Sequence, residues 1–211
     1  MKTKAAIISI VLLAITFASN AQDKPADYLW TYEGKSRTHE LGLYGELSWD
    51  YSTLGSDNIG WLGARAGLVI NHRWLIGVSG KALAYDKHLT ELAPEGQYRL
   101  ESGYSGMFVE YMQPVGNNLK LAFSITSAQG IALYRYEKEF TDSLPWHEEI
   151  IDVETYGVFE PQVAAMLRLK NNWWIEGHVS ARNTSPVAME QTNEKIFTKI
   201  NAGISVKYGI F

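Results

Sequence analysis

The sequence predicts an all-β fold, an eight-stranded antiparallel up-and-down transmembrane β-barrel. Three observations carry this prediction. Segments with alternating apolar residues recur at nearly even spacing over 39–211, a pattern typical of strands. The connections between these segments alternate in length. Aromatic residues gather where the segments meet the short connections, as they do at the interfaces of membrane barrels.

Eight alternating segments follow one another along the chain. In each, apolar or small residues occupy every second position, as Leu41, Leu43, Leu47 and Trp49 do in the first. Successive side chains of a strand point to opposite faces of a sheet, so each segment has one apolar face. The predicted strands cover 39–51, 59–71, 73–86, 98–112, 118–136, 153–169, 172–183 and 195–211.

Pro161 lies inside the sixth segment, on its apolar face. Proline has no N–H to donate to a strand ladder, and a closed barrel has no free edge that could hold it. We therefore expect a β-bulge near Glu160 and Pro161, or a sixth strand that is shorter than 153–169.

The lengths of the connections indicate which face of each strand points inward. Membrane barrels have tight turns on one rim, rich in residues such as Asn and Gly, and longer loops on the other. The short connections are 71–73, 113–118 and 170–172, and the others are 52–58, 87–97, 137–152 and 183–194. We therefore expect the apolar face to contact lipid and the other face to line the interior.

The inward face carries charges of both signs near the middle of the strands. Eight strands enclose only enough room for side chains, and buried ions are tolerated when they are paired. We predict an interior ion-pair network in which Glu110 faces Lys120 across the second short turn and Arg168 faces Glu176 across the third. Its members are Glu46, Arg65, Lys81, Glu110, Lys120, Glu160, Arg168, Glu176, His178, Arg182 and Lys207.

Aromatic residues predict two interface girdles. Those next to the short turns or at the end of the chain form the first: Trp74, Tyr111, Trp173, Trp174, Tyr208 and Phe211. Those near the opposite ends of their strands form the second: Trp49, Tyr51, Trp61 and Tyr85.

The N-terminal residues predict export. Lys2 and Lys4 precede an apolar run over 5–18, and Ser19-Asn20-Ala21 forms a small-x-small cleavage site. This is the pattern of a secretory signal peptide, which we assign to 1–21. The polar residues 22–38 are expected to form a flexible leader, and 39–211 to form the barrel domain.

Composition excludes several classes of protein. The chain has 23 acidic and 19 basic side chains and no basic stripe, which argues against a nucleic-acid partner. It has no cysteine and so cannot form a disulfide. The mature part has no second long apolar run, so no helix is expected to span a membrane there.

The leader, the eight segments and the C-terminal "KYGIF" over 207–211 give the chain a family resemblance. It resembles the small eight-stranded outer-membrane β-barrels of gram-negative bacteria, OmpX and the membrane domain of OmpA among them, over 39–211. The resemblance implies a place in the outer membrane, contact with its lipids and lipopolysaccharide, and recognition of the C-terminal strand by the barrel-assembly machinery. Phe211 matches the terminal aromatic of that family, although Tyr208 is three residues before it instead of two.

The predicted function is non-enzymatic, with no cofactor or metal. The barrel has a structural or surface-interaction role, and its interactions are expected in the extracellular loops. The longest loop, 137–152, has six carboxylates against one lysine and is a possible site for a surface ligand. A divalent cation could bridge these carboxylates. A solvated acidic loop is the simpler interpretation, because the carboxylates lack a ligand spacing.

A second interpretation is an enzyme. "GHVSARN", 177–183, places His178 and Ser180 on one strand face, and looks like the His-x-Ser pair of outer-membrane lipid A deacylases. The histidine would act as general base for the serine, oriented by Glu176 or Glu160. Ala181 follows the serine, where that family has an asparagine.

Two further interpretations use the same strands differently. A pore would be lined by Arg65, Lys81, Arg168 and Arg182, although eight strands leave little room for one. A soluble periplasmic ligand-binding barrel of the lipocalin kind would turn the apolar face inward and expose the charged residues.

Overall fold

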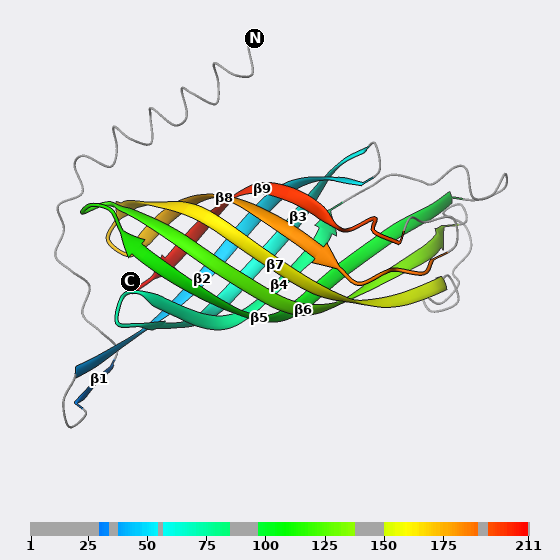
Figure 1. Ribbon diagram of the computed structural model, residues 1–211. Helices are drawn as coiled ribbons and strands as arrows, with labels where there is room; N and C mark the ends of the chain where they lie inside the picture. The colour runs from blue at the N-terminus through cyan, green and yellow to red at the C-terminus, as the bar shows by residue number, and fades with distance from the viewer. Residues whose placement is uncertain are drawn as a thin grey trace, which may run out of the picture.

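Nine strands form a single antiparallel sheet in the computed structural model, which describes residues 30–33, 38–54, 57–84, 97–137, 150–189 and 194–210. The strands follow one another in chain order, and β2 also pairs with β9 (Figure 1). This pairing closes β2–β9 into an eight-stranded up-and-down barrel and confirms the predicted fold class. The strands are β1 (Trp30–Glu33), β2 (Thr38–Leu54), β3 (Asp57–Ile70), β4 (Trp74–Ala84), β5 (Gln97–Pro114), β6 (Leu119–Glu137), β7 (Ile150–Lys170), β8 (Trp173–Thr184) and β9 (Lys199–Gly209). Within the described ranges, no helix has the length and apolar character needed to cross a membrane.

Each predicted segment corresponds to one strand from β2 to β9, with ends that differ by a few residues. β1 was not expected, because the polar composition of 22–38 indicates no strand. It pairs with the start of β2, with Trp30 opposite Leu41 and Glu33 opposite Thr38. It lies beyond the end of the barrel at which the short turns are found (Figure 1). The signal segment 1–21 lies outside the described residues.

The register of the strands fixes the width of the barrel. A path from each residue to its paired residue on the next strand, taken once around the barrel, starts at Leu41 of β2 and returns to β2 at Tyr51. The stagger of the barrel is therefore ten residues. Eight strands with this stagger tilt by about 40° and leave an interior that side chains fill. The path runs through Leu41, Ile70, Trp74, Tyr111, Phe123, Val163, Val179, Ala202 and Tyr51.

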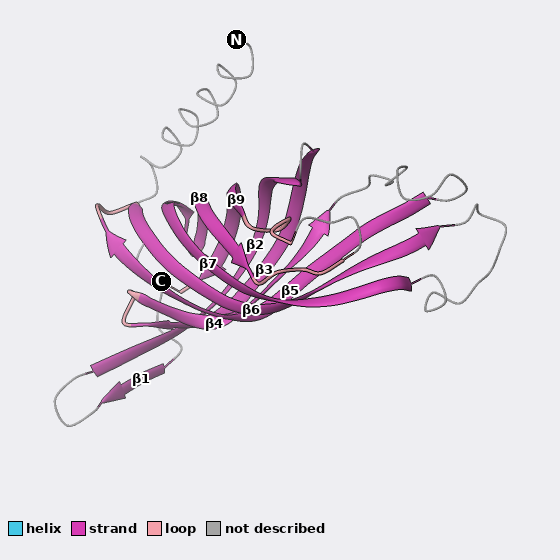
Figure 2. Cartoon of the chain, turned by 45° about the vertical axis from the view of Figure 1, so that its right-hand side comes forward, coloured by secondary structure: helices cyan, strands magenta, loops and turns pink. Residues whose placement is uncertain are grey.

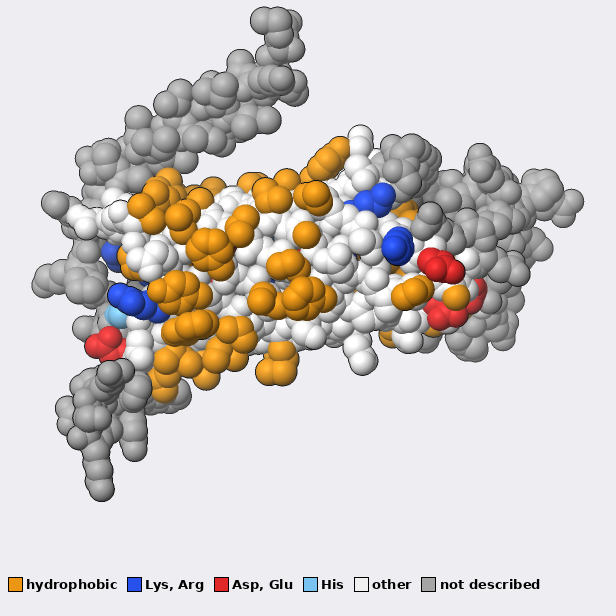
Figure 3. Space-filling model, viewed as in Figure 1, with side chains coloured by type: hydrophobic (Ala, Val, Ile, Leu, Met, Phe, Trp, Pro, Cys, Tyr) orange, Lys and Arg blue, Asp and Glu red, His pale blue; other side chains and the backbone are white. Residues whose placement is uncertain are grey.

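The apolar face of the strands points outward. Leu47 is 66% exposed and Ile200 is 74% exposed, whereas Lys207 and Glu110 are buried. Apolar side chains cover much of the outer wall on the short-turn side (Figure 3). A lipocalin-like barrel requires the reverse orientation, with the apolar face inside.

Four predicted girdle residues lie on the outer face beside the short turns. Trp74 packs on Tyr111, and Trp173 packs on Tyr208, each with ring centroids 4.9 Å apart. Trp174 is a correction, because it is buried inside the barrel. Neighbouring residues on a strand point to opposite faces, so Trp173 and Trp174 cannot both face outward.

The second predicted girdle also needs a correction. Trp49 and Tyr51 are exposed on the outer face, but Trp61 is fully buried in the interior. The period-two alternation of β3 places Trp61 on the same face as Arg65, which points inward. Tyr85 and the predicted girdle residue Phe211 lie outside the described residues.

Two short turns use residues with positive φ. Asn71 and His72 have φ angles of 49° and 57°, and Asn171 has a φ of 50°. Asparagine adopts this left-handed conformation more readily than most residues. The Asn71 side chain also accepts the backbone N–H of Glu40 at 3.1 Å, which ties this turn to β2.

Pro161 lies in β7 without a bulge, so the predicted bulge near Glu160 and Pro161 is wrong. The register between β7 and β8 is the same before and after this position, and β7 is longer than predicted. The register shift of this strand pair lies between Arg168 and Lys170. The ladder has no bridge at Glu160 or Pro161, as the missing proline N–H requires.

A neighbouring side chain replaces the missing donor. The register places Ala181 of β8 opposite Pro161, so the Ala181 carbonyl lacks the N–H that another residue would supply. The side-chain amide of Asn183 donates to this carbonyl at 3.3 Å. A backbone carbonyl without a hydrogen-bond partner is unfavourable, so Asn183 offsets the defect that the proline introduces.

Replacing Asn183 with Leu should reduce the free energy of unfolding by about 1 kcal/mol through the lost hydrogen bond. In a Pro161→Ala background the same replacement should cost less, because a backbone N–H is again present opposite Ala181. Urea unfolding of the four proteins measures the two costs, and the double-mutant cycle cancels the effect of the leucine side chain itself on the outer surface. Equal costs in the two backgrounds would contradict this role of Asn183.

Candidate functional site

The interior of the barrel is filled in three layers. An apolar layer beside the short turns includes Leu75, Met112 and Trp174. A second apolar layer at the opposite end includes Trp61 and Phe197. The middle layer is polar and buried, and contains Glu46, Asp50, Arg65, Lys81, Glu110, Glu160, Gln162, Glu176, His178, Ser180, Arg182, Asn201 and Lys207.

Lys207 of β9 is the centre of one ion cluster in the middle layer. Its fully buried ammonium lies 2.6 Å from Glu176, 2.9 Å from Glu110 and 3.5 Å from Glu46. Arg65 adds a second cation, 3.6 Å from the other oxygen of Glu110. The cluster joins β2, β3, β5, β8 and β9 across the barrel interior.

A second ion cluster lies nearer the long loops. Lys81 is 3.1 Å from Asp50 and 3.0 Å from Glu160. Arg182 lies 3.5 Å from Glu160, and its guanidinium is 4.0 Å from the centre of the Trp61 ring. Burial and this cation–π contact hold the Arg182 guanidinium against the apolar layer that contains Trp61.

His178 connects the two clusters. Its Nε2 lies 2.5 Å from Asp50 and its Nδ1 lies 3.3 Å from Glu176. Both ring nitrogens therefore face carboxylates. Only the imidazolium form has a proton on both nitrogens, so this position favours a charged His178.

The charge of the middle layer balances when His178 is counted as a cation. Its described members include five carboxylates, those of Glu46, Asp50, Glu110, Glu160 and Glu176. Four of its cations are Arg65, Lys81, Arg182 and Lys207, and His178 is the fifth. Uncompensated charge in a low-dielectric interior is strongly unfavourable.

Asp50 is a member of the middle layer that the sequence analysis missed. It is fully buried and contacts both Lys81 and His178. Its position in the chain carried the signal, because it shares the period-two phase of Glu46 on β2.

Two residues of the predicted ion-pair network, Lys120 and Arg168, lie outside the middle layer. The charged groups of Lys120 and Arg168 lie 5.0 and 6.0 Å from the centre of the Trp174 ring, at the short-turn end of the interior. Lys120 is buried and Arg168 is half-buried. They belong to the rim on the short-turn side, and the apolar layer separates them from the middle layer.

The two ion pairs predicted across short turns do not face each other. The register instead pairs Glu110 with Ser124, Lys120 with Pro114, Arg168 with Trp174 and Glu176 with Met166. Facing positions depend on where the turn begins, which the sequence does not fix to within one residue. Glu110 on β5 reaches across the barrel to Lys207 on β9, whereas Glu176 on β8 contacts Lys207 on the neighbouring strand.

The geometry around Ser180 does not bring a Ser–His pair together. The Ser180 hydroxyl donates to Glu160 at 2.6 Å and accepts the Asn201 amide at 3.2 Å. The nitrogens of His178 face Asp50 and Glu176 instead. Within the described ranges, the serine is buried and its proton is directed to a carboxylate, so the histidine is not placed to act as its general base.

The connection between β8 and β9 covers the outer end of the barrel. Ser185 donates its backbone N–H to the Gly157 carbonyl at 3.0 Å, and its hydroxyl accepts the Gly157 N–H at 2.9 Å. Val187 and Phe197 are buried, and the Phe197 ring stacks on Tyr156 at 5.2 Å. The part over 185–194 was predicted as a loop, whereas 195–198 was predicted as the start of the last strand, which instead begins at Lys199.

Comparisons with known proteins agree with this architecture. No protein-family model matches the chain, and no curated protein matches its sequence. The N-terminal β-barrel domain of Pseudomonas aeruginosa OprF is similar in structure at 10% identity, with a TM-score of 0.52 over 80% of this chain and 96% of that one. Neisserial surface protein A is similar at 11% identity, with a TM-score of 0.53 over 84% of this chain and 98% of that one. The chain therefore has the fold of the small eight-stranded outer-membrane β-barrels.

Proposed function

We propose that the protein is a non-enzymatic integral barrel of the outer membrane, exported by its N-terminal signal peptide. The observation that carries the proposal is the orientation of the strands. Apolar residues such as Leu47, Val78 and Ile200 are more than half exposed on the outer face, while charges are buried inside. A monomeric soluble protein rarely exposes so large an apolar surface, whereas lipid would cover it.

The interior supports a structural role in place of a channel. The ion clusters bridge strands on opposite sides of the barrel, and apolar layers lie above and below them. A conducting path would have to separate these charges and displace Trp61 or Trp174. We therefore propose that the interior acts as a plug that stabilises the closed barrel.

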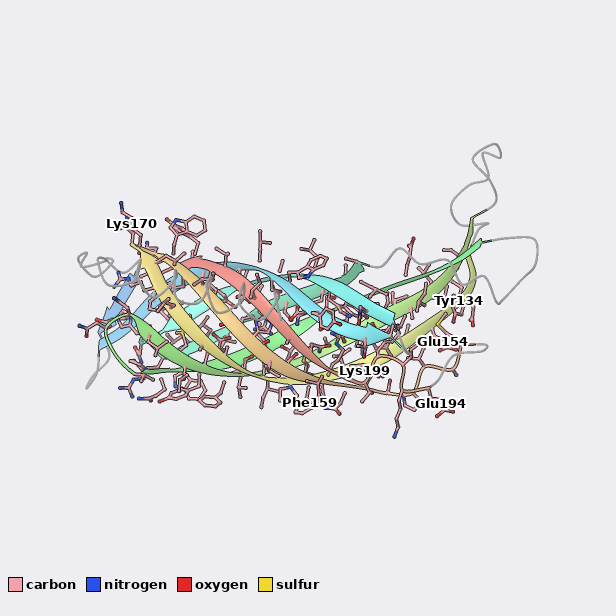
Figure 4. The ribbon with its side chains drawn as sticks, turned by 90° about the horizontal axis from the view of Figure 1, so that it is seen from above. Tyr134, Glu154, Phe159, Lys170, Glu194 and Lys199 are labelled. Carbon is pink, nitrogen blue, oxygen red and sulfur yellow. The ribbon has the colours of Figure 1, made fainter. Side chains whose placement is uncertain are left out.

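The end with the long loops is the proposed surface-interaction region. β5, β6 and β7 continue beyond their neighbours, with Gln97 still paired to Glu137 although β4 ends at Ala84 (Figure 2). Tyr134, Glu154 and Glu194 lie at this end and Lys170 lies at the other (Figure 4). The acidic loop 137–152, with its candidate cation or surface ligand, lies mostly outside the described residues.

The proposed partners follow from this position. The outer face would contact outer-membrane lipids and lipopolysaccharide. β9 would be the strand that the barrel-assembly machinery recognises, because it closes the barrel against β2 and its outward residues Ile204, Val206 and Tyr208 are apolar or aromatic.

Cell fractionation tests the proposal directly. The full-length protein should appear in the outer-membrane pellet, and unboiled samples should migrate differently from boiled ones on a denaturing gel. Planar bilayers containing the purified protein should show no conductance steps. Recovery in the periplasmic extract would overturn the membrane position, and regular conductance steps would overturn the plug.

A further inference from the structure

One wall of the barrel has a polar interruption in its apolar outer face, and the outward row of β6 is apolar again at Ile131. On β6 the outward residues from Leu119 to Ile125 are apolar, but the next two are Ser127 and Gln129. On β2, on the other side, the outward row stays apolar or aromatic as far as Tyr51. Figure 3 shows this wall with apolar side chains crowded on the short-turn side and a largely uncharged, non-apolar area before the charged residues at the loop end.

The polar residues of this wall form one patch over four strands. Ser105 of β5 pairs with Gln129 of β6. Ser127 lies opposite Phe159 of β7, which lies opposite Asn183 of β8. We name Ser105, Ser127, Gln129 and Asn183 the polar patch; all four are exposed on the outer face.

The wall is hollowed at the polar patch. Two hollows of about 890 and 780 Å³ adjoin here, and both are lined by Ser105 and Gln129. They exist because the surrounding outward residues are small, among them Ala82, Gly103 and Gly157. The hollows are open to the outside of the barrel and are separate from the ion clusters.

The depth of the polar patch places it within the outer leaflet. A transmembrane strand needs about 9–11 residues to cross the hydrocarbon. Ser105 is six residues from the girdle residue Tyr111, and its paired residue Gln129 is six residues from Phe123, which pairs with Tyr111. Hydroxyl and amide groups at this depth gain little from acyl chains and are stabilised by a polar partner.

Shape and charge select the partner. A two-fold contact between two copies of the chain would place the same surface of each against the other. The hollows would then face each other and leave a gap, which argues against a second copy as the partner. Among the described residues that line the hollows, Glu101 is the one charged residue, so these residues supply no cation to hold a phosphate. Uncharged donors and acceptors fit a hydroxyl-rich group, and Met107 and Phe159 beside them offer apolar surface to acyl chains.

We propose that the polar patch binds the uncharged, hydroxylated head group of a glycolipid in the outer leaflet. The sugar hydroxyls pair with Ser105, Ser127 and Gln129, and the acyl chains lie against Met107 and Phe159. Phe159 points away from the barrel, as this contact requires (Figure 4). The inference rests on the proposed membrane position and adds a lipid site that is independent of the loops.

Lipid retention measured by native mass spectrometry tests the site. The purified full-length barrel is placed in nanodiscs with equal amounts of a monoglucosyl diacylglycerol and a phosphatidylglycerol that share the same acyl chains. The wild-type protein should retain the glucolipid in preference. The Ser127→Leu/Gln129→Leu variant should lose about tenfold of this preference, the equivalent of one or two lost hydrogen bonds.

Controls separate this site from the proposed function. Ala165→Leu changes the outward face of β7 away from the hollows and should keep the preference. Equal retention of both lipids by a wild-type barrel that still shows heat-dependent gel mobility overturns the lipid site and leaves the membrane position intact. A dimer that disappears in the double Leu variant overturns it in favour of contact between copies. Preference for the phosphatidylglycerol overturns the assignment of an uncharged head group.

Discussion

Replacing Lys207 with Met should reduce the free energy of unfolding by about 3–5 kcal/mol, the usual cost of removing one partner from a buried ion cluster. The Lys207 ammonium is the closest cation to Glu176 and Glu110 and also contacts Glu46. In the variant, Arg65 is the one lysine or arginine of this cluster that is left beside the carboxylates. Urea unfolding in detergent micelles, followed by tryptophan fluorescence or gel mobility, measures the loss.

Two further variants define the cause of this loss. Lys170→Met removes an exposed lysine at the short-turn end and should change stability by less than about 1 kcal/mol. Lys207→Met/Glu110→Gln removes one charge of each sign and should be more stable than Lys207→Met alone. If Lys207→Met and Lys170→Met unfold at the same urea concentration, the buried cluster does not stabilise the barrel.

Replacing His178 with Leu should cost about 3 kcal/mol, since it leaves the middle layer with five carboxylates and four cations. Adding Glu176→Gln removes one of those carboxylates and should recover part of the loss. The same urea unfolding assay gives the four free energies of this double-mutant cycle. If the loss in the double variant equals the sum of the losses in the two single variants, His178 and Glu176 are not coupled. That result would contradict a charged His178, because an imidazolium is stabilised by the negative charge of Glu176.

Ser180→Ala serves as the matched control on the same face of β8. It removes one hydrogen bond to Glu160 and should cost about 1 kcal/mol. Mass spectrometry of lipid A from cells that express wild-type protein or the Ser180→Ala variant should show identical species. Deacylated lipid A that depends on Ser180 would establish the hydrolase in place of the non-enzymatic barrel.

Most of the fold could be predicted from the sequence because a barrel strand has a simple period. Alternation gave the eight strands of the barrel, and the unequal connections indicated which face points outward. β1 could not be predicted, since four residues in a polar segment carry no usable period. Pro161 was misjudged because a proline can be compensated by a side chain, here Asn183, without any change of register.

The interior was only partly predictable. Period two identifies the residues that point inward, and ten of the eleven predicted network residues are buried. Their partners depend on contacts across the barrel, such as Lys207 with Glu110, between residues 97 positions apart in the chain. Alternation also does not separate an inward apolar layer from a girdle, which is why Trp61 and Trp174 were assigned to the wrong side.

The place of Lys207 on the last strand has a consequence for biogenesis. β9 follows the seven other barrel strands in the chain, and the Lys207 ammonium meets Glu46 on β2 and Glu110 on β5 only after β9 has docked against β2. In an open sheet those two carboxylates lack this partner. Electrostatics therefore favours an all-or-none final step, in which zipping the first and last barrel strands together and neutralising the interior are one event.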